Sequence, residues 1–154
     1  MIKITFTDFE AFWFNRFIDR GLLGIKKTLF QKEGISENNG YDISFVKYNI
    51  DQSPEEILNN AIANDPVCIF VEPIGVVEKY GKDLGSYDHF LDLLVKEKQN
   101  RRIVIWTYIL SDDVDLLPRK FLGPCKQRKL EIALKYDPLK VVEIIRSQSR
   151  AYQK

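Results

Sequence analysis

The amino-acid sequence predicts an α/β fold in which helices cover both faces of a five-stranded, mostly parallel sheet. Two observations lead to this prediction: five short β-rich runs alternate with helical patterns, and the run at residues 67–71 is apolar throughout. Strands that alternate with helices are joined by crossover connections, which requires parallel pairing and gives a three-layer sandwich. A strand without a polar side chain has both faces buried, so we expect residues 67–71 to form the central strand.

Each strand is predicted from a short run that is rich in β-branched or aromatic residues. The first run stands at the start of the sequence given and alternates apolar and polar residues. The predicted strands cover residues 2–6, 43–48, 67–71, 103–107 and 130–134.

The helices are predicted from apolar residues at helical spacing and from start and stop signals. The clearest start is Ser53-Pro54-Glu55-Glu56, where Ser53 is the N-cap, Pro54 takes the first helical position and Glu56 can return a hydrogen bond. This helix should stop before the Asp65-Pro66 pair. Further helices are expected over about residues 9–32, before the basic run 96–102, over about 111–121 and from residue 137 onward. The connection at residues 72–86 is long and should lie at a functional site.

Length and composition predict one domain over residues 1–154, with an ordinary globular balance of 45% hydrophobic and 29% charged residues. The 23 basic and 22 acidic residues nearly cancel, so no overall charge draws the chain to nucleic acid or to an anionic membrane. Cys68 and Cys125 are expected to be reduced and structural. No apolar stretch is long enough for a membrane span, so the expected location is the cytoplasm.

Polar residues follow the predicted strands where each strand ends, and these are the candidate site residues. Ligands in open parallel sheets bind at the carboxyl ends of the strands. The residues placed there are Asp8 and Glu10 after the first strand, Glu72 after the third, Thr107 after the fourth and Lys135 after the fifth. We expect them to meet at one edge of the sheet.

This set resembles the receiver domain of response regulators, a flavodoxin-like fold with the same order of strands and helices. In that family an acid pair follows strand one, a phosphate-accepting Asp follows strand three, and a hydroxyl residue and a lysine follow strands four and five. The resemblance implies that Asp8 and Glu10 hold Mg²⁺, and that Thr107 and Lys135 bind an anion.

The sequence departs from the receiver pattern at the acceptor position, where Glu72 stands in place of Asp, and Tyr136 replaces the proline usual after the lysine. A glutamate places a fixed negative charge one methylene further from the backbone than an aspartate does. The resemblance therefore implies a pseudo-receiver, a non-catalytic signalling or protein-interaction module that is not phosphorylated in the usual way.

A second resemblance is to the cobalamin-binding domain of radical S-adenosylmethionine enzymes. It is carried by Gly21-Leu22-Leu23-Gly24-Ile25 and by the segment that runs from Asn49-Ile50-Asp51 into the helix start at Ser53. The motif that ligates cobalt through histidine is absent, and His89 lies far from the first strand. This resemblance implies, as an alternative function, cobalamin-type or other small-ligand binding without a histidine ligand.

Ordinary structural interpretations stay open beside these hypotheses. Asp8 and Glu10 can be helix N-caps, Glu72 a strand-end charge facing water, and Thr107 a plain strand residue. The sequence has no nucleophile elbow, P-loop or dinucleotide-binding motif, so an enzyme is not expected.

Two further groups of residues suggest binding surfaces. The first helix has more aromatic residues than one buried face needs, which favours a protein partner there: Phe9, Phe12, Trp13, Phe14 and Phe17. Basic residues are frequent late in the chain, but no base-reading motif accompanies them, so nucleic acid is not the expected partner. They are Arg119, Lys120, Lys126, Arg128, Lys129, Arg146 and Arg150.

Overall fold

Strands and helices alternate along the chain in a computed structural model, which describes residues 1–11, 14, 29–49, 51–73, 75–76, 84–108 and 122–152. The described elements are, in chain order, β1 (Ile2–Asp8), α2 (Leu29–Lys32), the 3-10 turn η2 (Glu37–Asn39), β2 (Tyr41–Lys47), α3 (Pro54–Ala61), β3 (Cys68–Val71), α5 (Leu84–Glu97), β4 (Arg102–Thr107), α6 (Leu122–Gln127), β5 (Glu131–Leu134) and α7 (Pro138–Tyr152).

The five strands form one sheet in the order β2-β1-β3-β4-β5, and every neighbouring pair is parallel. The predicted flavodoxin-like α/β fold is therefore confirmed. The strand within residues 67–71 occupies the middle of the sheet, as its uninterrupted apolar sequence predicted, because it needs cover on both faces.

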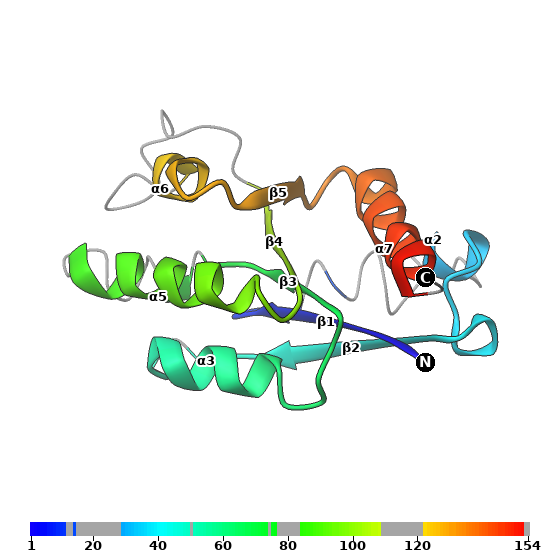
Figure 1. Ribbon diagram of the computed structural model, residues 1–154, viewed down its shortest axis with the longest axis horizontal. Helices are drawn as coiled ribbons and strands as arrows, with labels where there is room; N and C mark the ends of the chain where they lie inside the picture. The colour runs from blue at the N-terminus through cyan, green and yellow to red at the C-terminus, as the bar shows by residue number, and fades with distance from the viewer. Residues whose placement is uncertain are drawn as a thin grey trace.

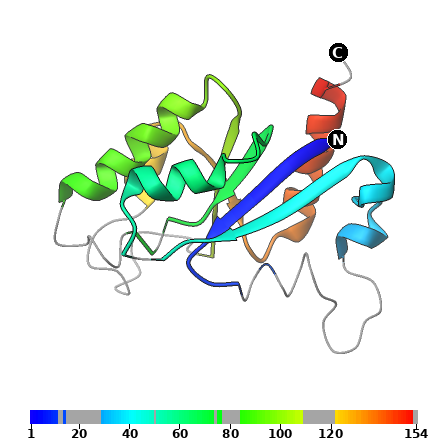
Figure 2. The ribbon, with the colours of Figure 1, turned by 90° about the horizontal axis from the view of Figure 1, so that it is seen from below.

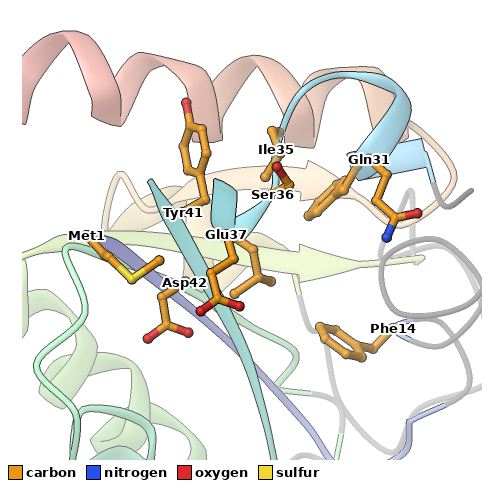
Figure 3. Close-up of a pocket in the computed structure, with 10 residues that line it drawn as sticks. Met1, Phe14, Gln31, Ile35, Ser36, Glu37, Tyr41 and Asp42 are labelled. Carbon is orange, nitrogen blue, oxygen red and sulfur yellow. The ribbon is translucent and has the colours of Figure 1, made fainter. Parts of the chain in front are cut away.

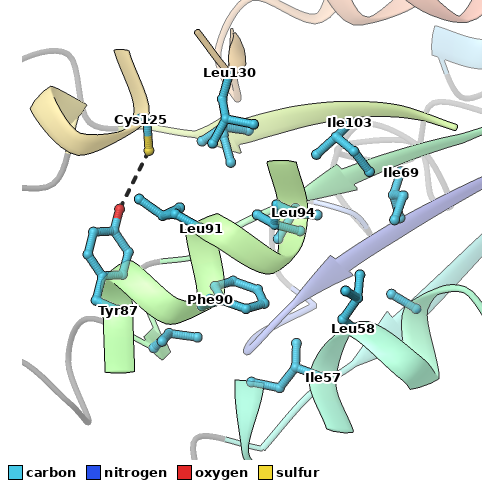
Figure 4. Packing of buried hydrophobic residues seen from close by; sticks show 14 of the residues in the cluster. Ile57, Leu58, Ile69, Tyr87, Phe90, Leu91, Leu94, Ile103, Cys125 and Leu130 are labelled. Carbon is cyan, nitrogen blue, oxygen red and sulfur yellow. Dashed lines mark hydrogen bonds between the residues drawn. The ribbon is translucent and has the colours of Figure 1, made fainter. Parts of the chain in front are cut away.

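Two hydrophobic clusters cover the two faces of the sheet, which makes the three layers. Side chains alternate along β3, so that Ile69 and Val71 join the cluster under α3, α5 and α6, while Cys68 and Phe70 join the cluster under α7. Figures 1 and 2 show α3 and α5 on one side of the strands and α7 with α2 on the other. In the first cluster, shown in Figure 4, the Tyr87 hydroxyl and the Cys125 thiol are 3.5 Å apart.

The helix start at Ser53 forms as the sequence predicts. The Ser53 side chain accepts a hydrogen bond from the Glu56 amide at 3.2 Å, and Pro54 opens the helix. The cap satisfies a backbone N–H that has no partner within the helix. The helix ends before Asp65, as the Asp-Pro pair indicated.

Some helix boundaries differ from those predicted from the sequence. The helix α5 begins at Leu84, inside the stretch 72–86 that was predicted to be a connection, and the short helix α6 was not predicted. The predicted helix at 111–121 and most of the one at 9–32 lie outside the described residues. Among the described helices, none is long and apolar enough to cross a membrane.

Candidate functional site

The carboxyl ends of the parallel strands bring the candidate residues to one edge of the sheet. Asp8 is the last residue of β1, and Glu72 directly follows β3 and donates its amide to the Thr7 carbonyl at 3.0 Å. Lys135 directly follows β5 and donates its amide to the carbonyl of Thr107, the last residue of β4, at 2.8 Å. Each residue is thus fixed by the ladder of its own strand.

Three of these side chains form a buried ion-pair cluster, which we call the Lys135 triad and which consists of Lys135, Asp8 and Glu72. The Lys135 Nζ lies 2.7 Å from Asp8 Oδ2 and 3.1 Å from Glu72 Oε2, and the exposed fraction of all three side chains is 0%. The contact with Asp8 also has the geometry of a hydrogen bond. One ammonium group therefore bridges two carboxylates in the absence of water.

Both carboxylate oxygens of Asp8 accept hydrogen bonds. Oδ1 accepts a hydrogen bond from the Glu10 amide at 3.1 Å, and Oδ2 accepts one from Lys135. Burial raises the pKa of Asp8 above its ordinary value, and this effect exceeds the opposing attraction of Lys135 and the hydrogen bonds from Lys135 and the Glu10 amide. The protonated form of Asp8 is thus favoured by folding.

Aromatic side chains close the site around Lys135. Its Nζ lies 5.0 Å from the centre of the Trp106 ring and 5.5 Å from that of the Tyr108 ring, within the range of cation–π attraction. The hydroxyl of Tyr48, which follows β2, donates a hydrogen bond to the Glu72 carbonyl. These rings replace the water that would otherwise solvate the ammonium group.

A glycine makes the close approach of Tyr48 possible. A Cβ atom built on Gly75 would lie 2.8 Å from the Tyr48 hydroxyl and 2.9 Å from the Phe9 Cβ, which is closer than real contacts allow. Gly75 therefore lets the segment after Glu72 pack directly against β1 and β2.

The two remaining candidate residues take different places. Thr107 is fully buried and is joined to Lys135 through its backbone carbonyl. Glu10 is partly exposed and contributes its backbone amide to Asp8. The negative charge of Glu10 also contributes to raising the pKa of Asp8.

The arrangement does not fit the predicted Mg²⁺ site at Asp8 and Glu10. Among the described residues, no group of three or more His, Cys, Asp or Glu side chains is placed to hold a metal ion. A cation on Asp8 would have to displace the Lys135 ammonium or the Glu10 amide from the carboxylate. The Lys135 ammonium already supplies a positive charge to the carboxylates of Asp8 and Glu72.

Sequence reasoning missed the tyrosines at this edge of the sheet. Tyr48 and Tyr108 each follow a strand directly, so the same strand-end rule that selected Lys135 would have found them. They were passed over because an aromatic residue at a strand end is ordinarily interpreted as core.

The predicted partner surfaces lie partly outside the described residues. Of the aromatic first helix, Phe14 is described and is buried, stacking on Phe45 at a ring distance of 4.7 Å, and Phe9 is partly buried near Tyr48. Phe12, Trp13 and Phe17 are outside the described ranges, as are Arg119 and Lys120.

The two cysteines and His89 have plain structural roles. Cys68 and Cys125 are both buried, and burial raises the pKa of the Cys68 thiol to about 12, so it stays protonated and unreactive. The exposed His89 contacts Glu55 through Nε2 and links α5 to α3.

A separate cavity of about 460 Å³ lies where α2 and η2 meet the start of β2 (Figure 3). Apolar side chains such as Phe14, Phe30 and Ile35 line it together with the carboxylates of Glu37 and Asp42. Its size falls within the range of about 300–1,000 Å³ that is typical of small-ligand sites.

Comparison of the chain with protein-family models, with curated proteins and with solved structures gave no match. The functional argument therefore rests on the geometry of the site. Among the described residues, that geometry supplies a buried ion pair at the position where a parallel sheet usually binds its ligand.

Proposed function

We propose that this chain is a non-catalytic, receiver-like interaction module that an internal ion pair holds in one state without phosphorylation. The observation that carries the proposal is the Lys135 triad, in which one buried ammonium group contacts both Asp8 and Glu72. In the receiver domains that the sequence resembles, the corresponding lysine binds the phosphoryl group on an aspartate. Here Glu72 presents its own carboxyl group to Lys135, in the place where a receiver would present the phosphoryl group.

The buried charges support a structural role over a catalytic one. A buried charge costs several kcal/mol unless it is paired, and the pairing of Lys135 with two carboxylates offsets this cost. Opening the site to a phosphodonor would break that pairing. The strand ends that carry the triad would therefore stay in a single arrangement, and a partner would recognise the unmodified surface.

Phosphorylation of the intact protein tests the proposal. Incubation with acetyl phosphate and Mg²⁺ should give no increase in intact mass, with an ordinary receiver domain treated in parallel as the positive control. A labile phosphoryl adduct that disappears in the Glu72→Gln variant would contradict the proposal.

The interaction part of the proposal needs its own measurement. Immobilised wild-type protein, with and without phosphodonor treatment, is used to capture partners from a lysate of the native host. We expect the same captured proteins in both cases. A partner that binds only after phosphodonor treatment would show that the module is switched, and would overturn the constitutive state.

Small-ligand binding is the second candidate function, and the cavity beside Phe14 and Phe30 favours it. The specific case of cobalamin binding is tested by titrating the protein with cobalamin at micromolar concentrations and monitoring the absorbance spectrum. We expect no spectral change, because a cobalt-ligating histidine is missing from the first loop. A tight, stoichiometric change would place ligand binding ahead of the interaction role.

A further inference from the structure

A second cleft, of about 460 Å³, opens at the amino-terminal edge of the sheet, at the other end of the strands from the Lys135 triad. We call it the basic cleft, and it is lined by Lys98, Arg101, Arg102, Ile103, Lys129 and Glu131. Two basic runs that are far apart in the sequence meet here, because α5 and α6 both end at this edge. The Lys98 Nζ reaches the Lys129 carbonyl at 3.4 Å.

The two arginines of the basic cleft are held in place by contacts with their own neighbours. Arg102 donates two hydrogen bonds to the carboxylate of Glu131, at 2.8 and 2.6 Å, and a third to Ser147. Arg101 donates Nε to Glu97 at 2.8 Å and Nη1 to the Pro66 carbonyl at 2.7 Å.

Arg101 is consequently a preorganised group. Only 9% of its side chain is exposed, and its Nη1 also pairs with Asp65 at 3.2 Å. Its Nη2 makes no hydrogen bond with any residue in the described ranges, so the donors of that group remain available. A guanidinium fixed in this way loses little conformational entropy when it binds an oxyanion.

The two lysines differ from the arginines because no acid neutralises them. Lys98 and Lys129 are both exposed, and within the described part of the chain neither pairs with a carboxylate. The Glu131 carboxylate that also lines the cleft is already bound by Arg102. The positive charge of the two lysines is therefore not neutralised by a carboxylate in the described part of the chain, although the Lys98 Nζ donates to the Lys129 carbonyl.

The backbone at Lys129 adopts a conformation that side-chain-bearing residues use infrequently. Lys129 has φ of 55°, the left-handed conformation that follows a helix end, and the Leu130 amide closes the turn on the Cys125 carbonyl at 3.1 Å. Glycine is the favoured residue at this position because it has no Cβ atom. A lysine there adds strain, and strain of this kind is characteristic of functional positions.

From these observations we propose that the basic cleft binds the phosphate group of a small soluble ligand. The Nη2 group of Arg101 and the two ammonium groups offer donors from the turn after α5 and the turn after α6 to one tetrahedral oxyanion. The size of the cleft fits a small molecule better than a polymer track. The site is separate from the Lys135 triad and does not depend on the proposed interaction role.

Calorimetric titration of the full chain at low salt tests the proposal, with inorganic pyrophosphate as the probe. Pyrophosphate should bind, and succinate, a dicarboxylate, should bind at least about tenfold more weakly because it offers fewer acceptor oxygens to the Arg101 Nη2 group and the two ammonium groups. Absence of pyrophosphate binding at millimolar concentrations would overturn the proposal, and would leave Lys98 and Lys129 as charges that offset the helix dipoles.

Two variants separate binding from folding. Lys129→Gly should weaken pyrophosphate binding about tenfold, since a charge-assisted contact is lost, without lowering the melting temperature, because glycine relieves the backbone strain. Lys98→Gln should weaken pyrophosphate binding by a similar factor. The matched control Lys140→Gln removes an equal charge from the start of α7 and should leave the affinity unchanged.

Two further results would reject the proposed phosphate site. If Lys140→Gln weakens binding as much as Lys129→Gly does, the attraction is a general charge effect and the site is rejected. If a short oligothymidine binds at least about tenfold more tightly than pyrophosphate at the same salt concentration, the cleft is a nucleic-acid contact and the small-ligand proposal is wrong.

Discussion

At the scale of single residues, the ammonium group of Lys135 decides the charge state of the candidate site. Its two carboxylate neighbours, Asp8 and Glu72, are as fully buried as the lysine itself. Two carboxylates and one ammonium carry a net negative charge when all are ionised. Burial away from water disfavours the ionised form of Asp8 and raises its pKa, and this effect outweighs the attraction of Lys135.

Removing the ammonium group should destabilise the protein strongly. Lys135→Met keeps the length of the side chain but leaves two buried carboxylates facing each other, which should lower the free energy of unfolding by about 3–5 kcal/mol near neutral pH. Glu72→Gln keeps one ion pair intact and should cost less, about 1–2 kcal/mol. Urea denaturation measures both changes.

The exposed Lys140 provides the matched control for this comparison. Lys140→Met should change the free energy of unfolding by less than about 0.5 kcal/mol, because its contact with Glu143 lies at the surface. Equal losses in Lys135→Met and Lys140→Met would show that the triad does not stabilise the fold.

Asp8 also predicts a dependence of stability on pH. Because its pKa is raised in the folded state above the ordinary value of 3.8, the folded protein holds this proton more tightly than the unfolded chain. The resulting contribution to stability is complete below 3.8 and is lost as the pH rises through the folded-state pKa.

This pH effect is measured by comparing variants from about pH 4 to about pH 7. The free energy of unfolding should fall more steeply with rising pH in the wild type than in Asp8→Asn, which cannot titrate at this position. Glu37→Gln, which removes an exposed carboxylate, serves as the control and should follow the wild type. Parallel profiles for wild type and Asp8→Asn would refute the prediction.

At the scale of elements, α3 shows how a local signal is sufficient to start a helix. Ser53, Pro54 and Glu56 are adjacent in the sequence, and all of the cap geometry is made within one turn. Packing then places the buried face of α3 against the sheet through residues such as Ile57 and Leu58. The cap fixes where the helix begins, and burial fixes which face points inward.

Loss of this cap should weaken α3 by a predictable amount. Ser53→Ala removes the acceptor for the Glu56 amide and should lower the free energy of unfolding by about 1 kcal/mol. Asn60→Ala, an exposed substitution on the same helix, should change it by less than about 0.5 kcal/mol. Thermal or urea denaturation gives both values, and a Ser53→Ala variant as stable as Asn60→Ala would contradict the role of the cap.

At the scale of the whole molecule, burial is greatest at β3 and decreases toward the edges of the sheet. All four residues of β3 are buried, and strands pair with it on both sides. The strand β2 pairs with β1 and stands at one end of the strand order, and most of its residues are partly exposed. The two strands should therefore differ in local stability.

Native-state hydrogen exchange measures that difference. Amides of β3 should exchange only by global unfolding, because two ladders and two hydrophobic clusters must open together. Amides of β2 should exchange through local opening at a lower free energy. Exchange of β2 as slow as that of β3 would show that another part of the chain protects this edge.

The sequence by itself determined the features that depend on local patterns. Propensity and periodicity placed the five strands, and an apolar run with no polar face required the central position for β3. The strand-end rule selected Asp8, Glu72, Thr107 and Lys135 from parallel pairing alone. The strand positions were confirmed, and the chosen residues do lie at one edge of the sheet, because each follows from neighbours in the chain or from the direction of the strands; their function stays a prediction.

Only the tertiary structure decided which side chains meet. Lys135 and Asp8 are 127 positions apart, and their 2.7 Å contact depends on the sheet order, the register and the rotamers of both side chains. The same holds for the meeting of Lys98 with Lys129 at the basic cleft. Side-chain contacts between distant segments are set by packing and electrostatics in three dimensions, and no local pattern in a single sequence encodes them.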